Sequence, residues 1–149
     1  MLSRDLGVRT LWFLPEEEVA ILFLFLLFGA GDKHGFHCVG IESCIEHGGS
    51  IVIIDAGVRF PENELPGIDY VIPDYQYLVK NSSKIKALII THGHEDHIGG
   101  IPFLLQTVHV PVIYATKLSA GLIKNKLEED NLLHLSNIVE IDANSIVKL

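Results

Sequence analysis

Four side chains that can ligate a metal occur within six residues of the sequence: His92, His94, Asp96 and His97. Three imidazoles and one carboxylate are donors that zinc accepts, and manganese is an alternative ion for such a set. A solvated loop that happens to be rich in histidine is the other interpretation, but so dense a cluster would be wasteful there. A purely structural zinc site would normally use more cysteine. The spacing therefore predicts a metal site and favours a catalytic one.

The elements around this cluster are those needed to position it. A β-branched strand predicted at Ala87–Ile90 delivers Thr91 to a polar loop that carries all four potential ligands. Gly93 is expected to let this loop turn tightly, and Gly99 and Gly100 are expected to allow close packing at the start of the helix that follows. The cluster is thus predicted to lie where a buried strand ends.

Elsewhere, short apolar runs rich in β-formers alternate with loops and helical patterns, which is typical of an α/β fold. Strands are predicted at Val19–Phe28, Cys38–Glu46, Ile51–Ile54, Ala87–Ile90, Val112–Tyr114 and Ile138–Ile141, with a further short one at Ser145–Val147. The run His47-Gly48-Gly49 is expected to form a hairpin turn. Helices are predicted at Tyr75–Lys80, after His97, and from Lys117 to about Leu133, with Thr116 as N-cap and with helical spacing of Leu118, Leu122, Ile123 and Leu127.

The composition fits one ordinary domain, because 149 residues with 48% hydrophobic side chains can support a core. A net charge of −8 argues against a protein that holds nucleic acid mainly through a basic surface, although a metal-centred nuclease can hold a phosphodiester through its ions. The apolar run Val19–Phe28 is shorter than the roughly 20 residues of a membrane-spanning helix, and its acidic flank does not suit a secretory signal. Cys38 and Cys44 are expected to be reduced thiols in or beside a strand.

The run His92-Gly-His-Glu-Asp-His97 resembles the HxHxDH signature of the metallo-β-lactamase superfamily. Its neighbours are similar, in order and spacing, to the ribonuclease J family of the β-CASP RNA-processing branch: Ile53–Glu62, Gly67–Asp74, Ile98–Pro102 and Gly121–Glu129. The resemblance covers roughly Gly29 to Leu149. The signature alone implies only the superfamily, and the neighbouring stretches carry the narrower assignment.

This resemblance implies a partial metallo-β-lactamase fold, an αββα sandwich of which the chain would supply the N-terminal β-sheet half with flanking helices. It also implies two Zn²⁺ ions in a complete site, with Mn²⁺ as the alternative. His92 and His94 would ligate one ion, while Asp96 and His97 would ligate the second, and Asp96 would also orient the nucleophile as the catalytic residue. Asp55, which follows Ile51–Ile54, would stand behind the ligands and hold their loops in place. A turn carboxylate at a strand end is the alternative for Asp55.

A complete site in this family would need a further histidine, a bridging aspartate and a last histidine, none of which can be assigned here. Residues 19–149 are expected to be the N-terminal part of a metallo-β-lactamase domain, residues 1–18 an unassigned extension, and the β-CASP domain is absent. With only four ligands, the chain alone is expected to bind metal weakly and to be inactive.

The implied function of the complete enzyme is metal-dependent hydrolysis of RNA phosphodiesters in RNA maturation and decay, by 5′–3′ exonuclease and endonuclease action in the cytoplasm. Its implied partners are RNA and either a second copy or a related ribonuclease subunit, with no membrane. Two alternatives remain open: a hydrolase of a small ester or thioester, and a non-catalytic truncated binding piece. Activity on small esters but not on RNA would favour the first.

Overall fold

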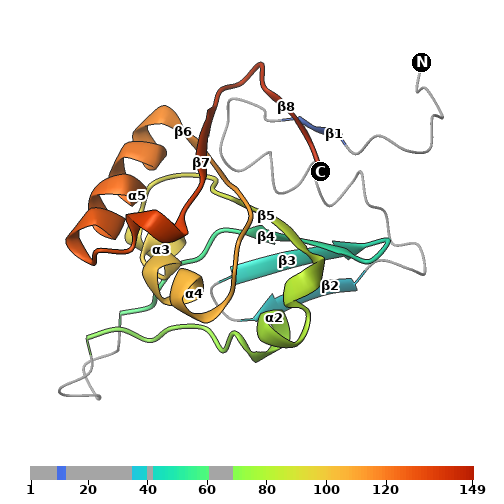
Figure 1. Cartoon of the computed structure of the whole chain (residues 1–149), viewed down its shortest axis with the longest axis horizontal. Coiled ribbons are helices and arrows are strands. Elements are labelled where there is room, and N and C mark those ends of the chain that lie inside the picture. The colour runs from blue at the N-terminus through green and yellow to red at the C-terminus, as the bar shows by residue number, and fades with distance from the viewer. Residues whose placement is uncertain (1–9, 13–34, 40–41, 61–68) are drawn as a thin grey trace.

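A six-stranded mixed sheet forms the framework of the protein (Figure 1). The computed structural model describes residues 10–12, 35–39, 42–60 and 69–149, so the strand predicted at Val19–Phe28 lies outside the described residues. The strands follow one another across the sheet in chain order: β2 (Gly35–Val39), β3 (Glu42–His47), β4 (Ser50–Ile54), β5 (Ile85–Ile89), β6 (Ile113–Thr116) and β7 (Ile138–Ile141).

The first three strands of this sheet are antiparallel neighbours. The predicted hairpin turn is confirmed between β3 and β4, where Gly48 and Gly49 have φ of 54° and 76° and His47 pairs with Ser50. Two successive residues with positive φ are what a two-residue type I′ turn requires, and glycine adopts this conformation without steric cost.

The single strand predicted at Cys38–Glu46 was wrong, because the structure places two strands there. β2 and β3 run antiparallel, and Val39 pairs with Glu42. The apolar residues Cys38, Val39 and Ile41 are interrupted only by Gly40, so the sequence reads as one continuous strand. Gly40 was the sequence signal that could have indicated the turn.

The second half of the sheet is parallel, and helices connect its strands. These helices are α2 (Gln76–Lys80), the 3₁₀ turn η1 (Ser82–Lys84), α3 (Glu95–Ile98), α4 (Ile101–Thr107), α5 (Lys117–Glu129) and the 3₁₀ turn η2 (Leu133–Leu135). Alternating strands and helices with parallel pairing confirm the α/β class, and the architecture agrees with a partial metallo-β-lactamase fold.

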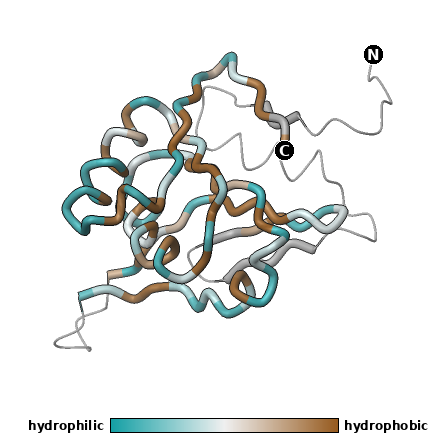
Figure 2. Tube along the Cα trace, in the orientation of Figure 1, coloured by the Kyte–Doolittle hydropathy of each residue, from teal (hydrophilic) through white to brown (hydrophobic). Residues whose placement is uncertain are grey.

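The helices pack on one face of the sheet and form the main core with it. Alternate strand residues, such as Ile51, Ile53, Leu88 and Ile113, are inaccessible to solvent in this core. Their neighbours in sequence point to the other face, where a smaller cluster contains Ile45, Ile54 and Ile89 with Val52, Tyr114 and Leu149 packed around it. Hydrophobic stretches, brown in Figure 2, run through the middle of the molecule, because the central strands carry apolar residues on both faces. This face alternation follows from the two-residue period of a strand.

The predicted helix from Lys117 to about Leu133 is confirmed in position but is shorter, because α5 ends at Glu129. Asn131 has φ of 58°, a left-handed conformation that terminates helices and that asparagine tolerates. Thr116 is the N-cap residue, but its hydroxyl pairs with the Ser119 hydroxyl at 3.0 Å and makes no hydrogen bond to the helix backbone.

The apolar face of α5 differs from the one its leucines suggest. Ala120, Ile123 and Leu127 are fully buried, whereas Leu118 and Leu122 are 76% and 42% exposed. Ser119 and Ala120, rather than Leu118 and Leu122, therefore complete the buried face of α5.

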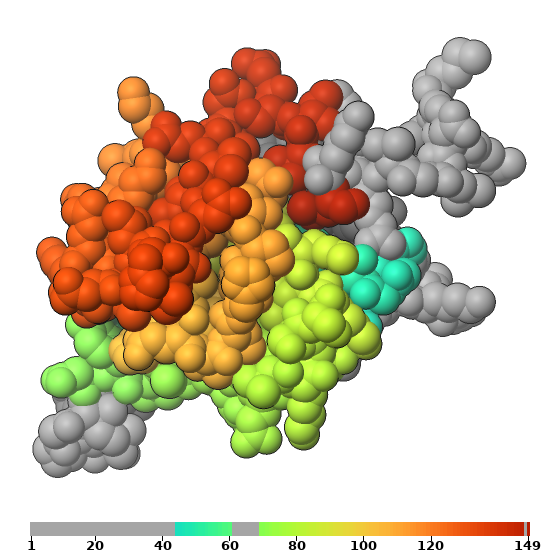
Figure 3. Space-filling model, in the orientation of Figure 1, coloured from blue at the N-terminus to red at the C-terminus, as the bar shows by residue number. Residues whose placement is uncertain are grey.

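A second, two-stranded sheet pairs β1 (Thr10–Trp12) with β8 (Ile146–Lys148), close to the predicted strand Ser145–Val147. In Figure 3, α5 and the residues that follow it form one side of the molecule, coloured orange to red. Within the described ranges, no helix is long and apolar enough to cross a bilayer.

Candidate metal centre

The polar cluster forms where two adjacent parallel strands end. Asp55 directly follows β4, and Thr91 lies two residues beyond the end of β5. The backbone N–H of Asp55 donates to the carbonyl of Ile89 at 2.9 Å, which extends the pairing of the two strands to their carboxyl ends. In parallel sheets, this edge is where functional side chains from neighbouring strands meet.

Two of the four predicted ligands lie on a helix rather than on the predicted loop. His92 and His94 are in the loop after β5, but α3 begins at Glu95 and contains Asp96 and His97. Gly99 and Gly100 separate this short helix from α4, which is the helix predicted after His97, so α3 is an additional helix that was not predicted. The correction matters for the site because a helical turn brings the last two ligands back toward the strand ends.

A backbone clasp holds α3 against the segment that follows β4. The Ala56 N–H donates to the His97 carbonyl at 2.8 Å, and the Gly100 N–H donates to the Ala56 carbonyl at 2.8 Å. A Cβ atom on Gly57 would lie only 1.7 Å from the Asp96 carbonyl oxygen, and one on Gly100 would lie 2.5 Å from the Gly57 carbonyl oxygen. The close packing predicted for Gly99 and Gly100 is confirmed, and Gly57 has the same role on the other side.

Gly93 makes a close approach to α5 that the sequence did not indicate. Among the described glycines only Gly48 and Gly49 have positive φ, so Gly93 is not needed for a left-handed turn. A Cβ on Gly93 would instead approach the Leu122 side chain to 2.7 Å. The glycine therefore lets the ligand loop lie close to α5.

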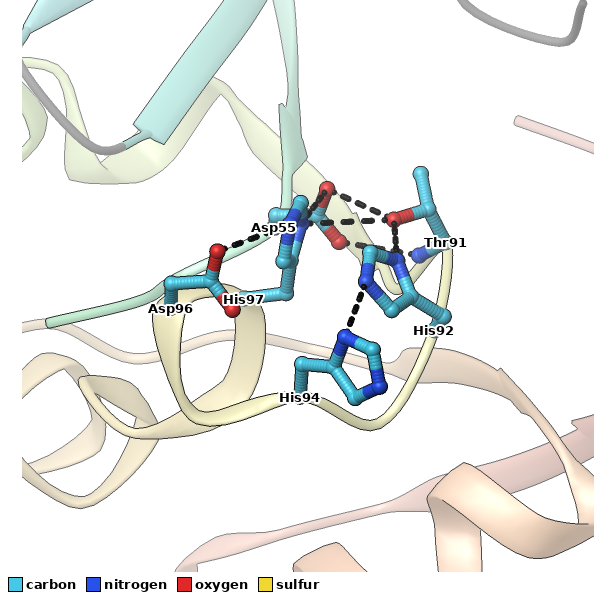
Figure 4. A network of polar contacts seen from close by, with 6 residues as sticks. All are labelled: Asp55, Thr91, His92, His94, Asp96 and His97. Atoms are coloured by element: carbon cyan, nitrogen blue, oxygen red, sulfur yellow. Dashed lines mark hydrogen bonds and ion pairs between the residues drawn. The ribbon is translucent and has the colours of Figure 1, made fainter. Parts of the chain in front are cut away.

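Asp55 is the buried centre of the polar network in Figure 4. One carboxylate oxygen, Oδ1, accepts the Thr91 N–H at 2.9 Å, while Oδ2 accepts the Thr91 hydroxyl at 2.8 Å and faces His97 Nδ1 at 2.9 Å. Asp55 is 6% exposed and has φ of 58°, an uncommon conformation for any residue other than glycine. Strained residues of this kind cluster at functional sites, where surrounding contacts maintain them.

The four potential ligands form two pairs. His92 Nε2 lies 3.1 Å from His94 Nδ1, and His97 Nε2 lies 3.5 Å from Asp96 Oδ2. Two donors bound to one tetrahedral zinc at about 2.0–2.1 Å lie roughly 3.3–3.4 Å apart, so both separations suit a shared ion. The rings of His92 and His97 are 3.9 Å apart between centroids, which places the two pairs side by side.

A comparison with protein families decides the assignment. The family model described as the metallo-beta-lactamase superfamily matches residues 43–144, which include Asp55 and all four potential ligands. The chain belongs to the metallo-beta-lactamase superfamily. Use of divalent metal ions is implied by this membership.

Within the superfamily, several ribonucleases J are similar to this chain. Ribonuclease J 1 of Streptococcus pyogenes serotype M3 is 56% identical over 101 residues, which are 68% of this chain and 18% of that protein. Ribonuclease J of Mycoplasma pneumoniae is 51% identical over 115 residues, or 77% of this chain and 20% of that protein. Ribonuclease J2 of Bacillus subtilis is 42% identical over 103 residues, which are 69% of this chain and 18% of that protein. The chain spans about a fifth of the length of these relatives.

The donor set fits the metal chemistry of the superfamily, but only in part. Each pair offers two donors, and within the residues that the structure describes no group of three or more histidine, cysteine, aspartate or glutamate side chains is arranged to hold an ion. A structural zinc normally has four ligands and a catalytic zinc three from protein. Each of the two pairs thus offers fewer donors than a complete zinc site needs.

The site is open to solvent on the side of its ligands. The side chain of Asp96 is 63% exposed and that of His97 is 27% exposed, whereas Asp55 behind them is buried. The exposed side chains of the cluster therefore lie between the buried Asp55 carboxylate and solvent.

Two supporting contacts of the superfamily motif were missed from the sequence. The Thr91 hydroxyl lies 3.0 Å from His92 Nδ1 as well as 2.8 Å from Asp55, so it is a junction of the network. Glu95, between two ligands, forms an ion pair of 2.9 Å with Lys126 of α5. A threonine at a strand end was the only signal for the first contact, and nothing in the local pattern indicates the second.

Proposed function

We propose that this chain supplies the first part of a two-metal site that hydrolyses RNA phosphodiesters. The observation that carries the proposal is the arrangement of His92/His94 and Asp96/His97 as two adjacent donor pairs in front of Asp55. The identity of 56% to ribonuclease J 1 of S. pyogenes supports RNA as the substrate class. For the complete enzyme we propose 5′–3′ exonuclease and endonuclease action in RNA maturation and decay, in the cytoplasm.

The proposed ions are Zn²⁺, with Mn²⁺ as the alternative, because imidazole and carboxylate donors suit both. His92 and His94 would hold one ion, and Asp96 and His97 would hold the other. When bound, such ions polarise a phosphoryl oxygen and lower the pKa of bound water from 15.7 to about 7, which yields hydroxide at neutral pH.

The residues of the chain have separate proposed roles around these ions. Asp96 is the proposed catalytic residue, because its exposed carboxylate can accept a hydrogen bond from the attacking water and orient it. Asp55 is buried and directed at His97 Nδ1, so its proposed role is to orient that ring with Nε2 toward the ion.

For the chain alone we propose weak metal binding and little RNA hydrolysis, since the described residues offer two donors per ion and no larger group. Residues 19–149 are the proposed N-terminal part of the metallo-β-lactamase domain. Pairing with a second copy or a related ribonuclease subunit is a further proposal for the complete enzyme.

The first test measures metal content by elemental analysis of the purified chain. The His92→Ala/His94→Ala variant is compared with a matched control, His109→Ala/His134→Ala, which removes two exposed histidines away from the cluster. We expect sub-stoichiometric zinc or manganese in the wild type and the control, and less in the first variant. Equal metal content in all three proteins would contradict the metal site.

The second test asks whether the site works on RNA. In a chimera, the matched segment of this chain replaces the corresponding 101-residue segment of the S. pyogenes ribonuclease J 1. We expect degradation of 5′-monophosphorylated labelled RNA by the chimera, and loss of this activity with His92→Ala/His94→Ala. A folded, metal-loaded chimera that hydrolyses a small ester but no RNA would contradict the substrate class.

A further inference from the structure

We propose that Thr91 is a positioning residue whose hydroxyl donates a hydrogen bond to Asp55 and accepts one from His92. One buried carboxylate thereby sets the tautomer of one histidine in each donor pair. This inference rests on the metal site of the proposed function and adds a residue to it. The geometry comes from three short contacts that meet at Asp55 Oδ2 and Thr91 Oγ1 (Figure 4).

The direction of the first hydrogen bond follows from the chemistry of its partners. An ionised carboxylate only accepts hydrogen bonds, and a hydroxyl has a single proton to donate. Because Thr91 Oγ1 lies 2.8 Å from Asp55 Oδ2, its proton points to the carboxylate. A hydrogen bond to a charged acceptor is stronger than one to a neutral nitrogen, so this direction is preferred to donation toward His92.

The second hydrogen bond is then determined. With its proton engaged, Thr91 Oγ1 can only accept from His92 Nδ1, which lies 3.0 Å away. His92 must therefore carry its proton on Nδ1, and its Nε2 keeps a lone pair. Nε2 is the atom that faces His94 at 3.1 Å, in the first donor pair.

In the second pair, Asp55 contacts the histidine directly, without an intervening hydroxyl. His97 Nδ1 lies 2.9 Å from Asp55 Oδ2 and therefore donates to it, which leaves the lone pair on Nε2, the atom that faces Asp96. Asp55 thus favours the same tautomer in both rings, directly at His97 and through the Thr91 hydroxyl at His92. In this tautomer the proton is on Nδ1, and the Nε2 lone pair is free for a metal ion.

Two hydrogen bonds to Asp55 hold the Thr91 hydroxyl in position. The backbone N–H of Thr91 donates to Asp55 Oδ1 at 2.9 Å, while its hydroxyl donates to Oδ2, so Thr91 makes a hydrogen bond to each oxygen of the carboxylate. The β-branched side chain of threonine has restricted χ1 rotamers, which limits the movement of its hydroxyl. Asp55 is 6% exposed, so water competes little for these hydrogen bonds.

The test reads the tautomer directly in the metal-free chain. Two-bond ¹H–¹⁵N correlation spectra distinguish imidazole protonated on Nδ1, on Nε2 and on both nitrogens. The His92 signals are identified by their loss in His92→Ala. Thr91→Val removes the hydroxyl but keeps the branched shape, and Thr91→Ser keeps the hydroxyl.

We expect Nδ1–H at His92 in the wild type and in Thr91→Ser, and a shift toward Nε2–H in Thr91→Val, while His97 stays Nδ1–H in all three. Nε2–H at His92 in the wild type, or an unchanged tautomer in Thr91→Val, would overturn the proposal. This readout needs neither metal nor RNA, so its failure is separate from failure of the proposed function.

A metal titration gives the second readout. With Zn²⁺ competed against a chromophoric chelator, the dissociation constant of Thr91→Val should rise roughly tenfold to a hundredfold, as for other losses of a partner behind a metal ligand. Thr91→Ser should restore most of the affinity. Equal affinity of Thr91→Val and wild type would overturn the proposal, and the tautomer of the wild type remains decisive if Thr91→Val does not fold.

Discussion

The close contact at Gly57 gives the sharpest prediction of stability. A Cβ at this position would lie 1.7 Å from the Asp96 carbonyl oxygen, 2.2 Å from its carbonyl carbon and 2.8 Å from the His97 nitrogen. All three atoms belong to the backbone, so no side-chain rotation can relieve the clash. In Gly57→Ala, the segment after β4 and helix α3 must therefore move apart.

The cost can be worked out from the hydrogen bonds that join the two segments. Three backbone bonds connect them: Ala56 to His97 at 2.8 Å, Val58 to Glu95 at 3.3 Å, and Gly100 to Ala56 at 2.8 Å. At about 1 kcal/mol each, their loss lowers the free energy of unfolding by about 3 kcal/mol. Because α3 carries Asp96 and His97, metal binding should weaken in the same variant.

The matched control is Gly121→Ala in the middle of α5. A Cβ at Gly121 meets nothing within 4 Å, so only helix propensity changes, and alanine should stabilise the chain by about 1 kcal/mol. Chemical denaturation followed by circular dichroism measures both variants. A Gly57→Ala chain as stable as the wild type, with unchanged metal affinity, would refute the view that the two segments interlock.

Three further predictions concern the polar contacts. Asp55→Asn keeps the left-handed backbone but offers an amide N–H to His97 Nδ1, so we expect a folded chain in which His97 carries its proton on Nε2. Zinc binding, measured by chelator competition, should then be at least about tenfold weaker. The pKa of Tyr77 is raised from 10.0 to about 12, mainly because its hydroxyl donates a hydrogen bond to Glu46. Stability should therefore fall as pH rises from about 10 to 12, and less so in Tyr77→Phe, as measured by denaturation across that range. Lys126→Ala removes an exposed ion pair with α3 and should cost under about 1 kcal/mol in the same assay, with unchanged metal content.

Much of the fold could be predicted from local patterns. The strand Ile138–Ile141 is confirmed at both ends, and the hairpin at Gly48 and Gly49 is confirmed from its glycine pair. Both features are encoded by neighbouring residues, through β-branched runs and through backbone conformations that glycine favours. The reversal between Val39 and Glu42 was missed because only Gly40 interrupts the apolar residues Cys38, Val39 and Ile41.

The arrangement behind the ligands could not be predicted in the same way. The donor types and spacing of His92, His94, Asp96 and His97 predict a metal site, but Thr91 and Asp55 are 36 positions apart and meet only because β4 and β5 are adjacent parallel strands. The extent of α3 was also missed, because a four-residue helix has too few positions to show a period. Contacts between distant segments depend on strand order, which local patterns do not specify.

The left-handed conformation of Asp55 shows how strongly these segments depend on one another. A residue other than glycine in this conformation costs of order 1–3 kcal/mol, and glycine would remove the cost. Glycine would also remove the carboxylate that accepts hydrogen bonds from Thr91 and His97. Three hydrogen bonds to a buried charged group, each worth about 1.5–3 kcal/mol, outweigh the strain. The backbone turn that starts the clasp therefore also places the carboxylate of Asp55, as the chain leaves β4, where it accepts hydrogen bonds from Thr91 and His97.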